Sequence, residues 1–256
     1  MKKTIKGIYL LISSLAISLL HLPFAFAKTG STTKLFYRPA ISATHPLPDS
    51  SILVSPAKSV YDSLQLGLAG LSRQAFDYAL KGYEKLISQG KLLNQSIIAI
   101  VDFSQPSSQK RLYVLDIKNY TVLFNTLVAH GRNSGKEWAT YFSNKPSSYK
   151  SSPGFYITGQ AYSGSNGYSL KLEGVENGIN DKAMKRAIVI HGADYVSESY
   201  ISSQGYIGRS QGCPAVPIKE SRNIINTLRD GACLYIYAPD QHYFFRSAML
   251  ADNSRG

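Results

Sequence analysis

The amino-acid sequence predicts a mainly β domain with sandwich-like packing, preceded by an N-terminal helical segment and containing one or two further helices. Two observations support this fold class. From Val60 to Gln89, apolar residues recur near the spacing of an amphipathic helix. After Asn94, short runs rich in Val, Ile, Leu and Tyr alternate with loops that contain Ser, Pro or Gly, which is typical of a sheet.

The first 27 residues have the pattern of a secretory signal peptide. Their apolar run of 13 positions is shorter than the roughly 20 residues that a bilayer span needs. We therefore expect an exported protein of the periplasm or cell wall with no membrane span after cleavage; the alternative is an uncleaved anchor. The positive n-region, the apolar run and the A-x-A cleavage signal are, in turn, Lys2, Lys3 and Lys6; Ile8 to Leu20; and Ala25-Phe26-Ala27.

The mature chain divides into four parts by composition. Residues 28–58 are rich in Ser, Thr, Pro and Lys and are predicted to be an arm or linker. Residues 59–92 form the helical segment, and residues 93–245 form the mainly β domain that is expected to carry the activity. Residues 246–256 are predicted to be a polar tail.

Each element follows from a local pattern. Gly67 and Gly70 predict a break in the helical segment, and its stronger half ends at Gly90. A hairpin turn is expected at Lys118-Asn119, and the long polar segment 131–153 is predicted to be a loop. The other expected strands cover residues 96–103, 111–117, 154–162, 167–175, 186–192 and 232–240, and a helix is expected over residues 218–231.

The charge of the chain favours an anionic surrounding. The formal net charge is +12, and +9 remains after the three signal-peptide lysines are removed. The basic residues are scattered, with no run of five or more, whereas nucleic-acid binders concentrate their charge on one face or arm. Together with the export signal, this predicts a wall polymer or membrane surface as the surrounding and no nucleic-acid partner.

The stretch GRSQGCPAV, residues 208–216, contains two candidate nucleophiles. One is Ser210, at the centre of a G-x-S-x-G pattern like that of the serine hydrolases. That pattern requires a core strand before the serine and a helix after it. The residues before it do not form a core strand, and Pro214 and Pro217 prevent an immediate helix. The sequence therefore disfavours Ser210 as the nucleophile.

Cys213 is the other candidate nucleophile, and His191, at the end of an apolar strand, is its candidate base. The loop between them is long enough to bring Cys213 back to the end of that strand. Backbone N–H groups at Gly212 and Cys213 would then face a developing oxyanion. Arg209 is expected to favour the thiolate or bind a substrate carboxylate. A structural disulfide between Cys213 and Cys233 is the open alternative.

The stretch VIHGADY…GRSQGCPAVP resembles the L,D-transpeptidase catalytic domain (YkuD-like) family, and within it the murein L,D-transpeptidase catalytic domain branch. That family is marked by an H-G strand end, a loop of about twenty residues and an S-x-G-C motif. Here these are His191-Gly192 and Ser210 to Cys213. Residues 151–157, SSPGFYI, resemble the family's T-P-x-G-x-F segment, and the resemblance covers about residues 60–240.

The chain departs from the family pattern at three points. Gln211 stands where most members have histidine, and Ala215 stands where most have arginine. The separation of His191 and Cys213 by 22 residues is slightly longer than usual. These differences concern substrate contacts more than the Cys/His pair, and Arg209 is a candidate replacement for the missing guanidinium.

The resemblance implies the catalytic fold of that family and a cysteine L,D-transpeptidase that uses no metal or other cofactor. Its substrates would be peptidoglycan stem peptides, as donor and as acceptor. Cys213 would form a thioester with the third residue of a tetrapeptide, with His191 as base, oriented by a carbonyl of Gly192 or Ser210. An acceptor amine would complete a 3-3 cross-link, whereas water would make the enzyme an L,D-carboxypeptidase.

Four further residues are candidates for the substrate cleft. Tyr195 and Tyr206 are expected to form a lid or wall, and Arg209 to contact substrate. His130, which also precedes a glycine at a strand end, is expected to line the cleft and rivals His191 as base. A third function remains open, a non-catalytic wall-binding module with a Cys213–Cys233 disulfide. The sequence carries no indication of oligomeric state.

Overall fold

The computed structural model describes residues 56–251. The chain divides into a unit over residues 1–51 and a unit over residues 52–256, and the described residues belong to the second. The signal peptide predicted over residues 1–27 and most of the arm predicted over residues 28–58 therefore lie outside the described residues. Between residues 56 and 251, no helix is both long and apolar enough to cross a bilayer.

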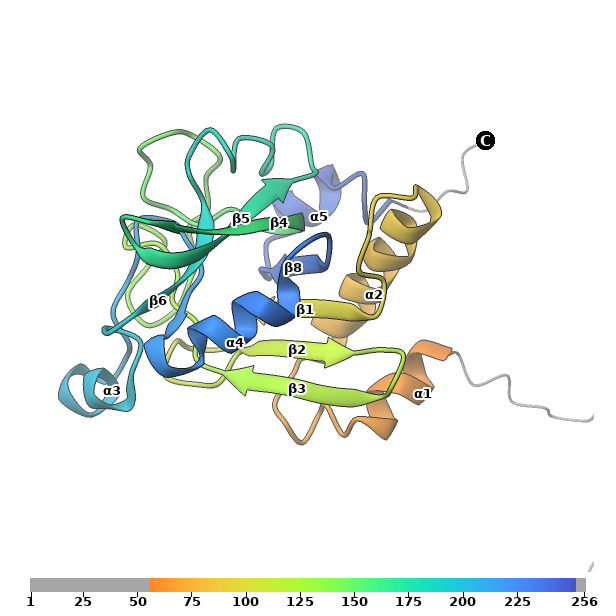
Figure 1. Ribbon diagram of the computed structural model, residues 1–256, viewed down its shortest axis with the longest axis horizontal. Helices are drawn as coiled ribbons and strands as arrows, with labels where there is room; N and C mark the ends of the chain where they lie inside the picture. The colour runs from red at the N-terminus through yellow and green to blue at the C-terminus, as the bar shows by residue number, and fades with distance from the viewer. Residues whose placement is uncertain (1–55, 252–256) are drawn as a thin grey trace, which may run out of the picture. The chain divides into compact units, whose positions relative to one another are not determined.

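A single eight-stranded sheet, in the order β3-β2-β1-β8-β4-β5-β6-β7, lies at the centre of the described residues (Figure 1). Most neighbouring strands are antiparallel, but β1 is parallel to β8 and β6 is parallel to β7. The elements in chain order are α1 (Pro56–Ser63), α2 (Arg73–Ser88), β1 (Ile97–Asp102), β2 (Leu112–Asp116), β3 (Thr121–Thr126), β4 (Gly154–Gly164), β5 (Gly167–Gly174), β6 (Val189–Ala193), α3 (Glu198–Gln204), β7 (Ala215–Pro217), α4 (Ile218–Leu228), β8 (Cys233–Tyr237) and α5 (Gln241–Arg246).

The mainly β fold class is confirmed. The N-terminal helical segment is present as two helices, and the break between them contains Gly67 and Gly70, as expected. Within the described residues, three helices follow the first strand, where one or two were expected. The additional helices are short, because α3 has 7 residues and α5 has 6.

β7 is the strand that the sequence did not predict. It has three residues, and Pro217, which lacks an N–H donor, is a residue that argues against a strand. It nevertheless pairs in parallel with β6, with Ala215 opposite His191. This short edge strand follows the GRSQGCP segment directly and ties it to the strand that carries the histidine.

The strands form one curled sheet rather than two stacked sheets. The chain that leaves β3, at one edge, pairs with the chain around β7, at the other edge. Ala129 bridges to Ala215 in the antiparallel sense, and Gly131 bridges to Ser210 in the parallel sense. The two edges of the sheet therefore meet, and the sheet approaches a barrel.

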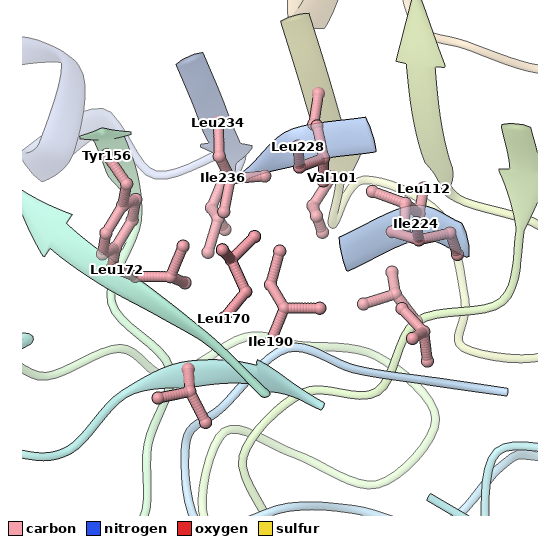
Figure 2. Packing of buried hydrophobic residues seen from close by; sticks show 14 of the residues in the cluster. Val101, Leu112, Tyr156, Leu170, Leu172, Ile190, Ile224, Leu228, Leu234 and Ile236 are labelled. Carbon is pink, nitrogen blue, oxygen red and sulfur yellow. The ribbon is translucent and has the colours of Figure 1, made fainter. Parts of the chain in front are cut away.

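The sheet separates two hydrophobic clusters, and alternate residues of β8 face one or the other. Leu234 and Ile236 belong to the α4-side cluster, which also contains Ile224 and Leu228 of α4 and is shown in Figure 2. Their neighbours on β8, including Cys233, belong to the α2-side cluster. This alternation follows from the two-residue period of a strand that is buried on both faces.

The C-terminal segment packs against the core. The sequence predicted a polar tail from residue 246, but Met249 and Leu250 are buried in the α2-side cluster. Nζ of Lys85 on α2 also donates a hydrogen bond to the carbonyl of Ala248, at 2.8 Å. The segment after α5 is therefore part of the α2 side of the fold as far as residue 251.

Candidate active site

His191 and Cys213 line the same cavity, which has a volume of about 630 Å³. His191 lies in the middle of β6, opposite Ser169 of β5 and Ala215 of β7, rather than at the end of its strand as expected. Cys213 lies two residues before β7. Because β6 and β7 are adjacent, the short edge strand brings the thiol to the strand that carries the imidazole.

The imidazole of His191 is oriented by the backbone. Its Nδ1 lies 3.1 Å from the carbonyl oxygen of Gly192, and a carbonyl only accepts, so Nδ1 carries the proton and Nε2 is left with a lone pair. Burial lowers the pKa of His191, although the bond to Gly192 acts in the opposite direction. The ring is therefore neutral at neutral pH, the form that a general base requires.

Gly192 leaves no room for a side chain. A Cβ at this position would lie 2.7 Å from Oγ of Ser221 on α4. Gly192 therefore has two effects: its carbonyl orients the imidazole of His191, and its lack of a side chain allows β6 to approach α4 closely.

Ser210 closes the turn that carries the thiol. Its hydroxyl donates to the carbonyl of Cys213 at 2.6 Å and accepts from the N–H of Gly212 at 3.0 Å. The side chain is buried, with 5% of its surface exposed. Both hydrogen-bonding functions of the hydroxyl are therefore used within the turn, and this arrangement does not support Ser210 as a nucleophile.

Gly212 is required by the backbone of the turn. Its φ is +121°, and a Cβ would lie 2.8 Å from the carbonyl oxygen of Lys150. Its N–H is occupied by Ser210, so the structure does not support it as an oxyanion donor. The N–H of Cys213 has no acceptor among the described residues and remains available for that role.

The thiol of Cys213 is hydrogen-bonded to a backbone carbonyl and not to the imidazole. Its Sγ donates to the carbonyl of Ala187 at 3.7 Å, and within the described residues no hydrogen bond joins it to His191. Burial raises the pKa of the Cys213 thiol, while the N–H of Val189 and the charge of Arg186 act in the opposite direction. The resting pair is therefore a neutral thiol beside a neutral imidazole.

Arg186 is a cavity residue that the sequence analysis missed. Its guanidinium donates to Ser143 O at 2.9 Å and Ser152 Oγ at 2.6 Å, and to Ser148 Oγ at 3.4 Å and Lys150 O at 2.5 Å. These bonds hold the 143–152 loop beside Arg186, and Oγ of Ser151 in the same loop donates to the carbonyl of Gly212 at 3.4 Å. The available signal was an arginine directly before the apolar run of the histidine strand, which is weak by itself.

Three of the expected cleft residues are placed at or near the cavity. Arg209 and Tyr195 line it, together with Arg132 and Tyr149, which the sequence did not indicate. Tyr206 is not a lining residue; its ring lies 5.8 Å from the guanidinium of Arg209. Its contact with the cavity is therefore indirect.

His130 is not a cleft residue. It is fully buried and does not line the cavity. Its Nδ1 accepts a hydrogen bond from Arg111 at 2.8 Å, so Nε2 donates to the carbonyl of Gly135, at 3.3 Å. Burial, with the charge of Arg111, lowers the pKa of His130 to about 3. His130 is therefore a buried residue whose two ring nitrogens are both hydrogen-bonded, and the structure does not support it as the rival base.

The two departures from the family motif have different surroundings. Ala215 is fully buried among the small cluster of Leu127, Ala129 and Ala193, where an arginine side chain would have to bury its charge. Gln211, in contrast, is exposed and lines the cavity. A guanidinium enters the cavity not from position 215 but from other parts of the chain.

The alternative disulfide is not formed. Cys213 and Cys233 are both free and buried, and they belong to the clusters on opposite faces of the sheet. The sheet between them prevents their pairing in this fold. Over residues 56–251, no three His, Cys, Asp or Glu side chains are grouped closely enough to hold a metal ion.

The family model described as "L,D-transpeptidase catalytic domain" matches residues 68–237. This is more than half of the chain, and the chain therefore belongs to the L,D-transpeptidase catalytic domain family. The family resemblance indicated by the sequence is thus confirmed. No curated protein matches the chain in sequence.

Among solved structures, the chain is similar to L,D-transpeptidases and to a cell-shape protein. An L,D-transpeptidase from Mycobacterium smegmatis is 12% identical, with a TM-score of 0.35, over 56% of this chain and 59% of that one. The helical cell shape determining protein Pgp2 from Campylobacter jejuni, as its K307A mutant, is 14% identical, with a TM-score of 0.39, over 57% and 48%. An L,D-transpeptidase from Stackebrandtia nassauensis is 15% identical, with a TM-score of 0.34, over 65% and 67%. The chain thus spans about half to three fifths of the length of the first two.

Proposed function

We propose that this protein is an exported cysteine L,D-transpeptidase that acts on peptidoglycan stem peptides. Cys213 is the nucleophile, His191 is the general base, and the reaction uses no cofactor. One observation carries the proposal: both side chains line one cavity, and the bond from Nδ1 to the Gly192 carbonyl leaves Nε2 of His191 able to accept a proton.

In the first half-reaction, the thiol leaves the Ala187 carbonyl and turns towards His191. Its proton passes to Nε2 as Sγ attacks the carbonyl at the L-centre of the third residue of a tetrapeptide donor. The N–H of Cys213 holds the oxyanion of the tetrahedral intermediate. The C–N bond then breaks, His191 returns the proton to the departing D-alanine amine, and a thioester remains on Cys213.

In the second half-reaction, the amine of another stem peptide attacks the thioester. Nε2 of His191 accepts a proton from the attacking amine, the C–S bond breaks, and the thiol is restored. The product is a 3-3 cross-link. If water attacks instead, the product is a tripeptide, and the same residues constitute an L,D-carboxypeptidase.

The proposed location is the periplasm or cell wall. The signal sequence before Lys28 supports export, and the charge of +9 that remains after its removal suits an anionic wall. The acceptor is an amine of the wall, and no nucleic acid takes part.

The test uses the mature chain, residues 28–256, incubated with disaccharide-tetrapeptides, with the products read by mass spectrometry. We expect cross-linked dimers that have lost D-alanine. Cys213→Ala removes the product, whereas Cys233→Ala, which changes the buried cysteine on the other face of the sheet, retains it. Tripeptide alone would identify the carboxypeptidase. No conversion by a folded wild-type chain would refute both catalytic functions.

A further inference from the structure

The cavity of the candidate active site is positively charged. Three arginines line it, namely Arg132, Arg186 and Arg209, and no aspartate or glutamate does. They come from three separate segments of the chain, so no run of basic residues in the sequence predicts this cluster.

None of the three guanidiniums is neutralised within the described residues. The ion pairs of arginine found there, Arg73–Asp77 and Arg229–Asp230, lie elsewhere. Arg186 donates only to neutral oxygens of the 143–152 loop. Its charge is thus held at the cavity, but its two terminal nitrogens are already engaged.

Arg132 and Arg209 differ from Arg186 in having donors to spare. Arg132 lies over the ring of Tyr149, 4.0 Å from its centre, and its side chain donates no hydrogen bond among the described residues. Arg209 uses only Nη1, which donates to the carbonyls of Arg132 at 3.3 Å and Gly135 at 3.1 Å. Each retains N–H groups in the planar arrangement that matches a carboxylate.

This arrangement selects the charge of the ligand. Guanidiniums that share a cavity repel one another and repel an ammonium group, and both costs fall when a ligand brings negative charge. Because one guanidinium can bind one carboxylate through two parallel hydrogen bonds, the two guanidiniums with spare donors can bind two carboxylates. A protonated amine is disfavoured in the same space, so the part of the donor peptide that lies beside these arginines is expected to be the part that carries carboxylates.

We propose that Arg132 and Arg209 are specificity-determining residues that bind the free carboxylates on the second and third residues of the donor peptide. The enzyme would then discriminate against donors in which these two groups are amidated. The inference rests on the proposed function for the nature of the donor. Arg186 supports the same selection through its charge and by holding the loop that carries Tyr149.

The test measures binding without turnover. In the mature Cys213→Ala chain, the Kd of a tetrapeptide with free carboxyl groups on its second and third residues is compared by calorimetry with that of the same peptide amidated at both. We expect the amidated peptide to bind at least about tenfold more weakly, since one charge-assisted contact is worth about that factor. Adding Arg132→Gln or Arg209→Gln should remove most of the difference.

Arg222→Gln is the matched control, because Arg222 lies over the ring of Tyr168 at 4.7 Å, outside the cavity. It should leave the preference intact. Equal affinity for the two peptides would overturn the proposal. So would tighter binding of a glycerol phosphate oligomer than of the free-acid peptide, which would assign the arginines to an anionic wall polymer.

Failure of the proposed function gives a different result. If the wild-type chain converts neither peptide while the Cys213→Ala chain still prefers the free-acid form, the carboxylate site stands and the transpeptidase reaction does not. If the wild-type chain converts both peptides with the same KM, the reaction stands and the carboxylate site does not. Circular dichroism of each arginine variant confirms that the comparison is made on folded protein.

Discussion

Replacing Ser210 with alanine is expected to destabilise the turn formed by residues 210–213 without removing the proposed nucleophile, Cys213. The hydroxyl joins the carbonyl of Cys213 and the N–H of Gly212 inside a buried turn. Alanine removes both hydrogen bonds and leaves two backbone groups that water does not reach easily. If the serine were the attacking group, the same substitution would abolish the chemistry and leave the packing nearly unchanged.

The size of the effect follows from those two bonds. Each buried hydrogen bond contributes about 1 kcal/mol net, and a buried polar group left unpaired costs about 1–3 kcal/mol. We therefore expect Ser210→Ala to lower the free energy of unfolding by about 2–4 kcal/mol. For a domain of this size, that corresponds to a fall in Tm of about 5–15 °C.

The assay combines thermal unfolding with alkylation of the thiol by iodoacetamide, read by peptide mass spectrometry. Ser210→Ala should unfold at lower temperature yet still be labelled at Cys213 and retain some product formation at low temperature. Ser203→Ala is the control, because its exposed hydroxyl also donates to a carbonyl three residues away, that of Tyr200. An unchanged Tm together with complete loss of product would refute the reasoning and restore Ser210 as the nucleophile.

Three further outcomes are expected. Because burial raises the pKa of Cys213, its alkylation rate should keep rising through pH 9; a plateau below pH 8 would instead indicate a thiolate–imidazolium pair. Gly212→Ala should abolish activity, since its Cβ would meet the Lys150 carbonyl, whereas Gly90→Ala, also at positive φ but with open space around it, should cost stability of about 1 kcal/mol and no activity. Arg111→Met should lower the free energy of unfolding, measured with urea, by about 3 kcal/mol or more, because it leaves the carbonyls of Val128 and Gln105 and Nδ1 of His130 without their donor. An unchanged urea midpoint would contradict a stabilising role for Arg111.

The elements that the sequence predicted are those with a local cause. Strand alternation and apolar runs follow from the burial of each strand, and Gly67 and Gly70 mark a break that depends only on backbone preference. Residue types and spacing made His191 and Cys213 a candidate pair but left a Cys213–Cys233 disulfide equally open, and the family resemblance favoured the pair. Their joint place on one cavity depends on β7, which is too short and too rich in proline to be recognised from its own residues.

The residues that the sequence missed have non-local causes. Arg186 reaches the cavity because four acceptors on the 143–152 loop hold its side chain there, and that loop has no periodicity of its own. His130 was expected in the cleft because it precedes a glycine, as His191 does. Its ring is instead buried against Arg111, a pairing of residues 19 apart that no local pattern encodes. Gly212 failed as an oxyanion donor because the neighbouring serine takes its N–H.

The pairing between the two edges of the sheet affects when, during folding, the cavity with His191 and Cys213 forms. The bridges Ala129–Ala215 and Gly131–Ser210 join segments 86 and 79 residues apart, so the turn that holds the thiol depends on a partner synthesised much earlier. Contacts at such separation form late, because their loop entropy is overcome only after much of the chain is ordered. A chain that is only partly folded carries the sulfur of Cys213 on a strand that has not yet found its partners. His191 and Cys213 therefore come to line one cavity only after the bridges between the two edges of the sheet have formed.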